Sequence, residues 1–115
     1  MECIRVPSYL AEAYVPRSRM QEARAAGSRA RTAAERLSQE GMAVRYVRTM
    51  FLPDDETCFH VFEAASAQIV HEVCRRAELG SPRIVPAMEW AGNRRHEASA
   101  RGRPTRSPGR WDEDG

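Results

Sequence analysis

The strongest constraint on the fold is a pair of β-rich segments joined by one short turn. Residues 44 to 52 are dense in apolar and β-branched side chains, and residues 57 to 63 (Thr-Cys-Phe-His-Val-Phe-Glu) have the same character. Between them stand residues 53 to 56, Pro-Asp-Asp-Glu. Proline sets φ at the first central position of a turn, and aspartate side chains bond back to the backbone. This spacing predicts a β-hairpin.

A strand and a helix are predicted before the hairpin. Residues 9 to 15 combine aromatic and β-branched side chains and stop at Pro16, as a short strand does. Ser18 is the expected N-cap of the helix, and Gly41 is its expected C-terminal stop. The stripe between them at helical spacing is Met20, Ala23, Gly27, Ala30, Ala34 and Leu37. Because most of these residues are small, we expect this helix to lie close to a sheet.

A second helix and a last strand are predicted after the hairpin. Ser66 is the expected N-cap, and Gly80 follows the last helical turn. The apolar positions of this helix are Ile69, Val70, Val73, Cys74 and Ala77. Residues 83 to 90 then form the strand. Pro86 removes one backbone donor from it, which is typical of an edge strand.

The resulting order of strand, helix, strand, strand, helix, strand predicts an α+β fold of the ferredoxin-like (βαββαβ) kind. Right-handed crossovers place both helices on one face of a four-stranded antiparallel sheet, with the strands in the spatial order fourth, first, third, second. We expect residues 8 to 90 to form this domain, after an N-terminal extension of residues 1 to 7. In residues 91 to 115 Gly, Arg, Ser and Pro dominate, so we expect a disordered, arginine-rich tail.

Charge argues against a nucleic-acid-binding surface. All 18 basic residues are arginine, and the first 90 residues carry twelve of them against twelve acidic residues. A nucleic-acid surface normally needs a clustered basic face. RNA-binding proteins of this topology also need aromatic residues on the open sheet face. Phe59 is expected on the helix side, so RNA binding is not predicted.

Composition also bears on redox state and location. The three cysteines have no CxxC spacing, which argues against a disulfide framework and a thiolate zinc site. No apolar run approaches the roughly 20 residues that cross a bilayer. The first residues lack the basic start and apolar stretch of a signal peptide. We therefore expect a cytoplasmic protein with no membrane partner.

The sheet face without helices is expected to be covered by a second subunit. Strand alternation assigns residues to faces. The expected open-face residues are Leu10, Glu12, Tyr14, Val44, Tyr46, Arg48, Met50, Cys58, His60, Phe62, Val85, Ala87 and Glu89. Many of them are apolar, and a domain of this size gains stability by burying more surface. A homodimer is therefore predicted.

Within that covered face, a polar cluster is expected from three neighbouring strands. It consists of Glu12, Arg48 and His60, with Tyr14 and Tyr46 close by. An unpaired buried charge is costly, so these groups need partners. One interpretation is a structural Glu12–Arg48 ion pair with His60 hydrogen-bonded beside it. The other is a pocket for a small polar ligand or a divalent metal.

The metal interpretation uses a different set of residues. Glu12 and His60 are suitable ligand types for a divalent metal, and Glu63 is a third candidate. Arg48 argues against a cation and favours an anionic ligand, so both interpretations stay open.

Three segments resemble a small bacterial domain-of-unknown-function family of dimeric ferredoxin-like proteins that includes a nickel-binding protein. These are residues 9–12 (Tyr-Leu-Ala-Glu), the hairpin residues 44–64, and residues 83–89 (Arg-Ile-Val-Pro-Ala-Met-Glu). The resemblance covers about residues 8 to 90. It implies the same fold and a dimer, with nickel as a candidate cofactor.

The chain departs from that family at two positions of the expected cluster. Arg48 stands where the nickel-binding branch carries a histidine, and His60 stands where other members have a different residue. Glu12 and Glu63 match acidic positions of the family. Arginine cannot ligate a metal, so this departure puts the metal role in question.

The leading hypothesis is a protein that binds a small polar ligand between the sheet and its partner. One alternative is a nickel-type metal-binding protein. Another is a cofactor-free enzyme of the monooxygenase or isomerase type, in which His60 is a general base with its pKa tuned by Glu12. The sequence leaves open whether the protein is an enzyme.

Overall fold

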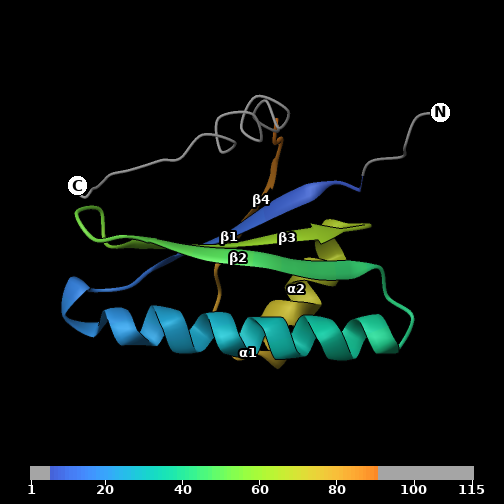
Figure 1. Ribbon diagram of the computed structural model, residues 1–115, viewed down its shortest axis with the longest axis horizontal. Helices are drawn as coiled ribbons and strands as arrows, with labels where there is room; N and C mark the ends of the chain where they lie inside the picture. Colours follow the sequence, from blue (N-terminus) through green and yellow to red (C-terminus); the bar gives the residue numbers. More distant parts are fainter. Residues whose placement is uncertain (1–5, 91–115) are drawn as a thin grey trace, which may run out of the picture.

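The structure is a computed structural model that describes residues 6 to 90 (Figure 1). Its elements are β1 (Ser8–Tyr14), the 3-10 turn η1 (Arg17–Arg19), α1 (Met20–Gln39), β2 (Val44–Leu52), β3 (Thr57–Ala64), α2 (Ala67–Arg76) and β4 (Arg83–Ala87). This is the predicted order, so the α+β, ferredoxin-like topology is confirmed. The predicted tail and residues 1 to 5 lie outside the described residues.

The sheet has the predicted topology. Its strands pair antiparallel in the order β2-β3-β1-β4, and both helices lie on one face, below the sheet in Figure 1. β4 is an edge strand, as Pro86 indicated. It ends at Ala87, earlier than predicted, because its partner β1 begins at Ser8, the residue opposite Ala87.

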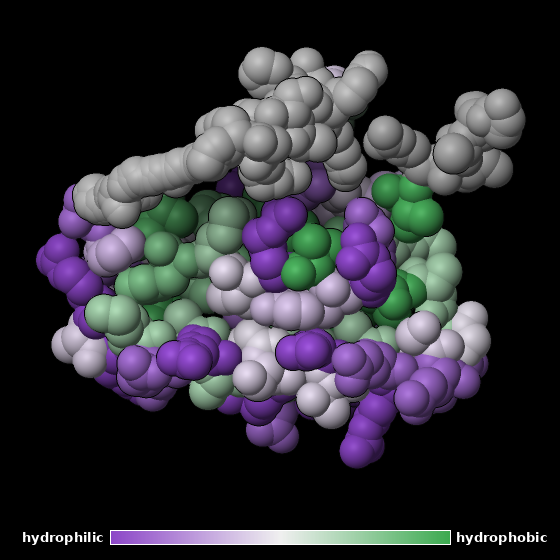
Figure 2. All heavy atoms as spheres, viewed as in Figure 1, coloured by the Kyte–Doolittle hydropathy of each residue, from purple (hydrophilic) through white to green (hydrophobic). Residues whose placement is uncertain are grey.

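The core between helices and sheet is built around one aromatic ring and several small side chains. Phe62 is its largest fully buried residue. Leu37 and several alanines of α1 pack there with Val70 and Val73 of α2. The surface of α1 that faces away from the sheet is hydrophilic and forms a belt along the lower edge in Figure 2. Hydrophobic side chains lie above it, over the sheet.

The helix ends follow the predicted signals at three of four positions. Ser66 caps α2, accepting from the Ile69 backbone N–H at 3.4 Å. Gly41 follows α1 with φ of 98°, and Gly80 follows α2 with φ of 75°. Ser18 is not the cap of α1: it lies within η1, because the Arg19 N–H closes a tight turn onto the Pro16 carbonyl at 2.8 Å.

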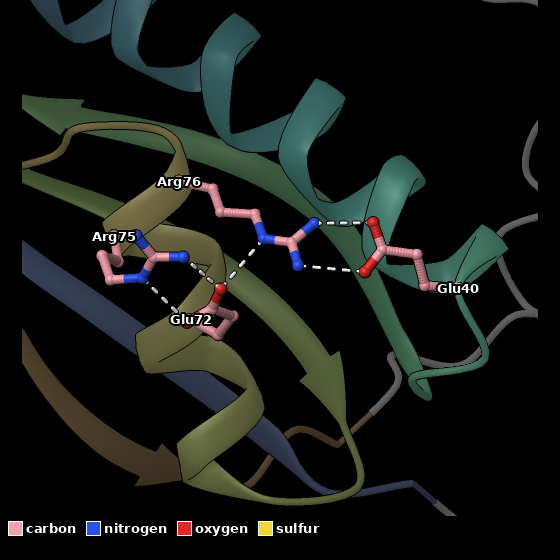
Figure 3. A network of polar contacts seen from close by, with 4 residues as sticks. All are labelled: Glu40, Glu72, Arg75 and Arg76. Atoms are coloured by element: carbon pink, nitrogen blue, oxygen red, sulfur yellow. Dashed lines mark hydrogen bonds and ion pairs between the residues drawn. The ribbon is translucent and has the colours of Figure 1, made fainter.

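An ion-pair network joins the end of α1 to α2 (Figure 3). The Arg76 guanidinium donates to both carboxylate oxygens of Glu40, at 2.8 and 2.9 Å, and to Glu72 at 2.9 Å. Glu72 also accepts from Arg75 at 2.6 Å. Hydrogen bonds from Arg75 and Arg76 lower the pKa of Glu72 to about 2. All four groups are accessible to water, so the network contributes little to stability.

The assignment of β3 to a sheet face was wrong. Cys58, His60 and Phe62 point toward the helices and are buried there. Phe59, Val61 and Glu63 therefore share the face without helices, and Phe59 is not on the helix side as predicted. Alternation shows which residues of a strand share a face, but it does not show which face meets the helices. In β3 the two alternating sets of residues are both apolar enough to be buried, so the pattern did not distinguish them.

The assignment of β2 was half wrong, because the strand contains a bulge. Tyr46 pairs with Phe62, whereas Arg48 pairs with the next residue along β3, Val61. One residue of β2 is thus extra, and the alternation reverses there. Val44 and Tyr46 face the helices, while Arg48 and Met50 stay on the open face as predicted. Leu10, Glu12 and Val85 also lie on the open face.

Candidate functional site

The predicted cluster of Glu12, Arg48 and His60 does not form. Glu12 and Arg48 are on the open face, and His60 is on the helix face. On the open face, Glu12 and Arg48 each lie near an oppositely charged residue outside the predicted cluster. Arg83 Nη1 lies 3.3 Å from Glu12, and Arg48 Nη1 lies 3.8 Å from Glu89. The expected Glu12–Arg48 pair is replaced by these two.

Two of the remaining predicted residues, Tyr14 and Glu63, are paired with residues outside the predicted cluster. The Tyr14 hydroxyl lies 3.3 Å from the Glu56 carboxylate, and Glu63 pairs with Arg45 at 3.0 Å. Tyr46 is on the helix face with His60. Within residues 6 to 90, no group of three or more His, Cys, Asp or Glu side chains is arranged to hold a metal ion. The predicted set Glu12, His60 and Glu63 is therefore not a metal centre, since the sheet separates His60 from both acids.

A different polar group lies between α1 and the sheet: a chain of four side chains centred on His60. The Tyr46 hydroxyl lies 2.6 Å from Thr49 Oγ1, and that oxygen lies 2.8 Å from His60 Nδ1. The other ring nitrogen, Nε2, lies 3.6 Å from Cys58 Sγ. Thr49 and His60 are direct cross-strand neighbours on β2 and β3, and so their side chains project to the same face.

Gly27 of α1 makes room for this chain. A Cβ atom at Gly27 would lie 2.6 Å from Thr49 Oγ1 and 3.2 Å from the Tyr46 hydroxyl. Real Cβ atoms do not approach an oxygen that closely. The helix therefore crosses the hydroxyl pair at glycine, which explains the one glycine within its stripe of buried alanines.

The environment keeps His60 and Cys58 uncharged near neutral pH. Only 2% of His60 is exposed. Burial, and secondarily the positive charge of Arg29, lower its pKa to about 4. The proposed tuning by Glu12 is wrong, because Glu12 is on the other face. Burial also raises the pKa of the Cys58 thiol. The pair thus presents a neutral imidazole and a protonated thiol.

His60 and Cys58 line a hollow of about 520 Å³, named here the histidine hollow. It lies beside α1, β1 and β3 and is bounded on one side by the segment that leads from α2 to β4. Its other lining residues are Ala13, Tyr14, Val15, Glu22, Ala25, Ala26, Arg29, Glu78, Leu79 and Pro82. Hollows of this size hold small organic molecules.

Arg29 connects α1 to the far wall of the histidine hollow. Its Nε donates to the Ala77 carbonyl at 2.8 Å, and Nη2 lies 3.4 Å from the Glu78 carbonyl. These carbonyls belong to the C-terminal end of α2, where a cation is favourable. Arg29 therefore holds the wall in place and supplies the only positive charge that lines the hollow within residues 6 to 90.

Thr49, Cys58 and Arg29 were not among the site residues predicted from the sequence. One signal was available, since a lone glycine in a stripe of alanines indicates a close approach of another group. That signal marks where the helix touches the sheet, but it does not tell which strand residues lie beneath it.

Comparisons of the chain with known protein families, with curated proteins and with solved structures gave no match. Neither helix within residues 6 to 90 is long and apolar enough to cross a membrane.

Proposed function

We propose that this protein binds a small, uncharged organic ligand with a carbonyl group, and that the ligand occupies the histidine hollow. The observation that carries the proposal is a neutral, buried imidazole that lines a hollow of ligand size. Each buried polar atom normally has at least one hydrogen-bond partner. His60 has a strong hydrogen bond at Nδ1 and only the weak, 3.6 Å contact with sulfur at Nε2.

The hydrogen-bond chain indicates which ligand group suits Nε2. If Tyr46 donates to Thr49 and Thr49 donates to Nδ1, each hydroxyl has an acceptor, and the ring proton sits on Nε2. In this tautomer, His60 donates to a ligand acceptor such as a carbonyl oxygen. Donors in series polarise one another, which strengthens the last donor of the chain.

The walls of the hollow favour an uncharged, largely apolar ligand body. Ala25, Ala26 and Leu79 supply apolar surface. The charged side chains of the lining are Glu22, Arg29 and Glu78, so no excess of positive charge selects an anion. A carbonyl on a small apolar or aromatic framework matches both the donor and the walls.

Benzamide is a suitable first probe, and its binding can be observed by NMR. Its titration should shift the His60 ring resonances and the amide signals of Ala26 and Cys58. A His60→Leu variant should weaken binding about tenfold or more, because a donor to a buried acceptor is lost. Glu12→Gln, on the opposite face, is the matched control and should bind like the wild type.

Two outcomes would contradict this proposal. One is that benzamide and a matched ketone leave the wild-type His60 ring unshifted at millimolar concentration. The other is that a folded His60→Leu variant binds benzamide as tightly as the wild type. The wild-type ring resonances test the proposal even where the variant does not fold.

We also propose that the open sheet face binds the same face of a second copy of the chain. Apolar side chains that are at least partly exposed gather there from all four strands: Leu10, Met50, Phe59 and Val85. The charges of that face are paired within the chain, as Glu12–Arg83, Arg45–Glu63 and Arg48–Glu89. A face with an apolar centre and balanced charges is compatible with its own copy under two-fold symmetry.

A further inference from the structure

A second hollow lies on the other side of α1, between that helix and the edge strand β2. Its volume is about 410 Å³, and we name it the arginine hollow. Its lining residues are Met20, Gln21, Ala23, Arg24, Gly27, Ser28, Arg31, Tyr46, Thr49 and Phe51. Within the described part of the chain, none of these residues is acidic. The helix thus separates two hollows of different electrostatic character.

The helix side of the arginine hollow is a row of hydrogen-bond donors. Gln21, Arg24, Ser28 and Arg31 follow one another at intervals of three and four residues. Residues at these intervals lie on one side of a helix. The two arginines therefore start about two turns apart along the same wall, and both of their long side chains line the hollow between them. Arg31 has one exposed partner on its own helix, Glu35 at 3.6 Å, and exposed pairs of this kind are weak.

The strand side of the arginine hollow is aromatic. Tyr46 and Phe51 of β2 line it together with Thr49. The Tyr46 ring meets Phe62 edge to face, with centroids 5.9 Å apart and planes at 69°, and its hydroxyl is bonded to Thr49. Two independent contacts thus hold this ring. A fixed aromatic wall opposite two arginines is complementary to a flat, negatively charged molecule.

We infer that the arginine hollow binds a small aromatic carboxylate. The carboxylate pairs with Arg24 and Arg31, because the planar guanidinium fork matches carboxylate geometry and forms charge-assisted hydrogen bonds. The ring of the ligand packs against Tyr46 and Phe51. This site shares no charged residue with the histidine hollow, so the inference stands whether or not the proposed function does.

Benzoate tests this site, with benzamide as its uncharged counterpart of nearly the same shape. Benzoate should shift the amide signals of Arg24, Ser28 and Phe51, whereas benzamide should leave them in place. Raising the ionic strength from about 0.01 to about 0.15 M should weaken benzoate binding, because the screening length falls from roughly 30 to 8 Å. An Arg24→Gln/Arg31→Gln double variant should lose about tenfold or more in affinity.

Arg36→Gln is the matched control, since Arg36 is on the same helix but does not line this hollow. It should bind benzoate like the wild type. The inference is overturned if benzamide binds this hollow as well as benzoate does, or if the folded double variant keeps its affinity. It is also overturned if Arg36→Gln weakens binding as much as the double variant, because binding would then depend on overall charge.

Discussion

The Thr49 hydroxyl oxygen lies 2.8 Å from His60 Nδ1, directly across the β2–β3 pair and beneath Gly27 of α1. This one contact joins three elements. It gives a partner to Nδ1 of a histidine that is only 2% exposed, and it depends on a helix that carries no side chain at the crossing point. The bulge of β2 lies just before Thr49, and it turns that hydroxyl toward the helices.

Replacing Thr49 by valine should lower the free energy of unfolding by about 1–3 kcal/mol. The variant keeps the shape of the side chain but leaves His60 Nδ1 and the Tyr46 hydroxyl without their partner. Urea denaturation followed by circular dichroism measures the loss. Thr49→Ser retains the hydroxyl and should lose less. Equal losses in the two variants would show that packing matters here and the hydrogen bond does not.

Replacing Gly27 by alanine should destabilise the protein by about 1–3 kcal/mol, although alanine is the better helix former. The new Cβ would lie 2.6 Å from Thr49 Oγ1, so the helix or the hydroxyl pair has to move. The matched control is Ser28→Ala at the next, exposed position, which should change stability by less than about 0.5 kcal/mol. A Gly27→Ala variant as stable as the wild type would contradict the close crossing.

The stability of the protein should fall between pH 6.5 and pH 4 because of His60. Its pKa is about 4 in the folded protein, below the usual 6.5. Between these values the unfolded chain binds a proton that the folded protein does not, so acid favours unfolding. The full effect is on the order of 3 kcal/mol and is absent above pH 6.5.

Denaturation curves at several pH values, compared with those of His60→Asn, isolate this contribution. The variant lacks the titrating group and should depend less steeply on pH in that window. Parallel curves for the two proteins would mean that His60 titrates normally in the folded state.

Replacing Met50 by arginine should convert the proposed dimer to a monomer. Met50 is 40% exposed on the open face, so the isolated fold should tolerate the charge, whereas the interface should not. Sedimentation velocity gives the molecular mass. Met42→Arg, at a 44% exposed site outside the sheet, is the control and should remain dimeric. A wild type that is monomeric at high micromolar concentration would remove the dimer proposal.

Replacing Glu40 by glutamine should slightly lower the melting temperature at low salt. The change removes the charge that joins Arg76 of α2 to the end of α1. Because these groups are accessible to water, the difference from the wild type should shrink as salt is added. Glu35→Gln, whose only ion pair is within α1 in the described part of the chain, should have a smaller effect. A difference that grows with salt would be inconsistent with an electrostatic contribution.

The order and type of the elements could be predicted from the sequence because their signals are local. The Pro-Asp-Asp-Glu turn, the Ser66 cap and Gly41 each act on neighbouring backbone groups. The topology then followed from chain connectivity and the handedness of the crossovers. The face of β1 was also predicted correctly, because Ala11 and Glu12 differ clearly in size and polarity.

The candidate site could not be predicted in the same way, because it depends on which face of each strand meets the helices. In β3, His60 alternates with Val61, and both are almost fully buried, so periodicity alone could not assign the imidazole to a side. In β2, a bulge reversed the alternation between Tyr46 and Arg48. The sequence by itself determined the elements and their order, since those follow from short-range backbone chemistry. Only the tertiary structure decided that His60 meets Thr49 under Gly27 and not Glu12, because strand register and helix packing place those side chains.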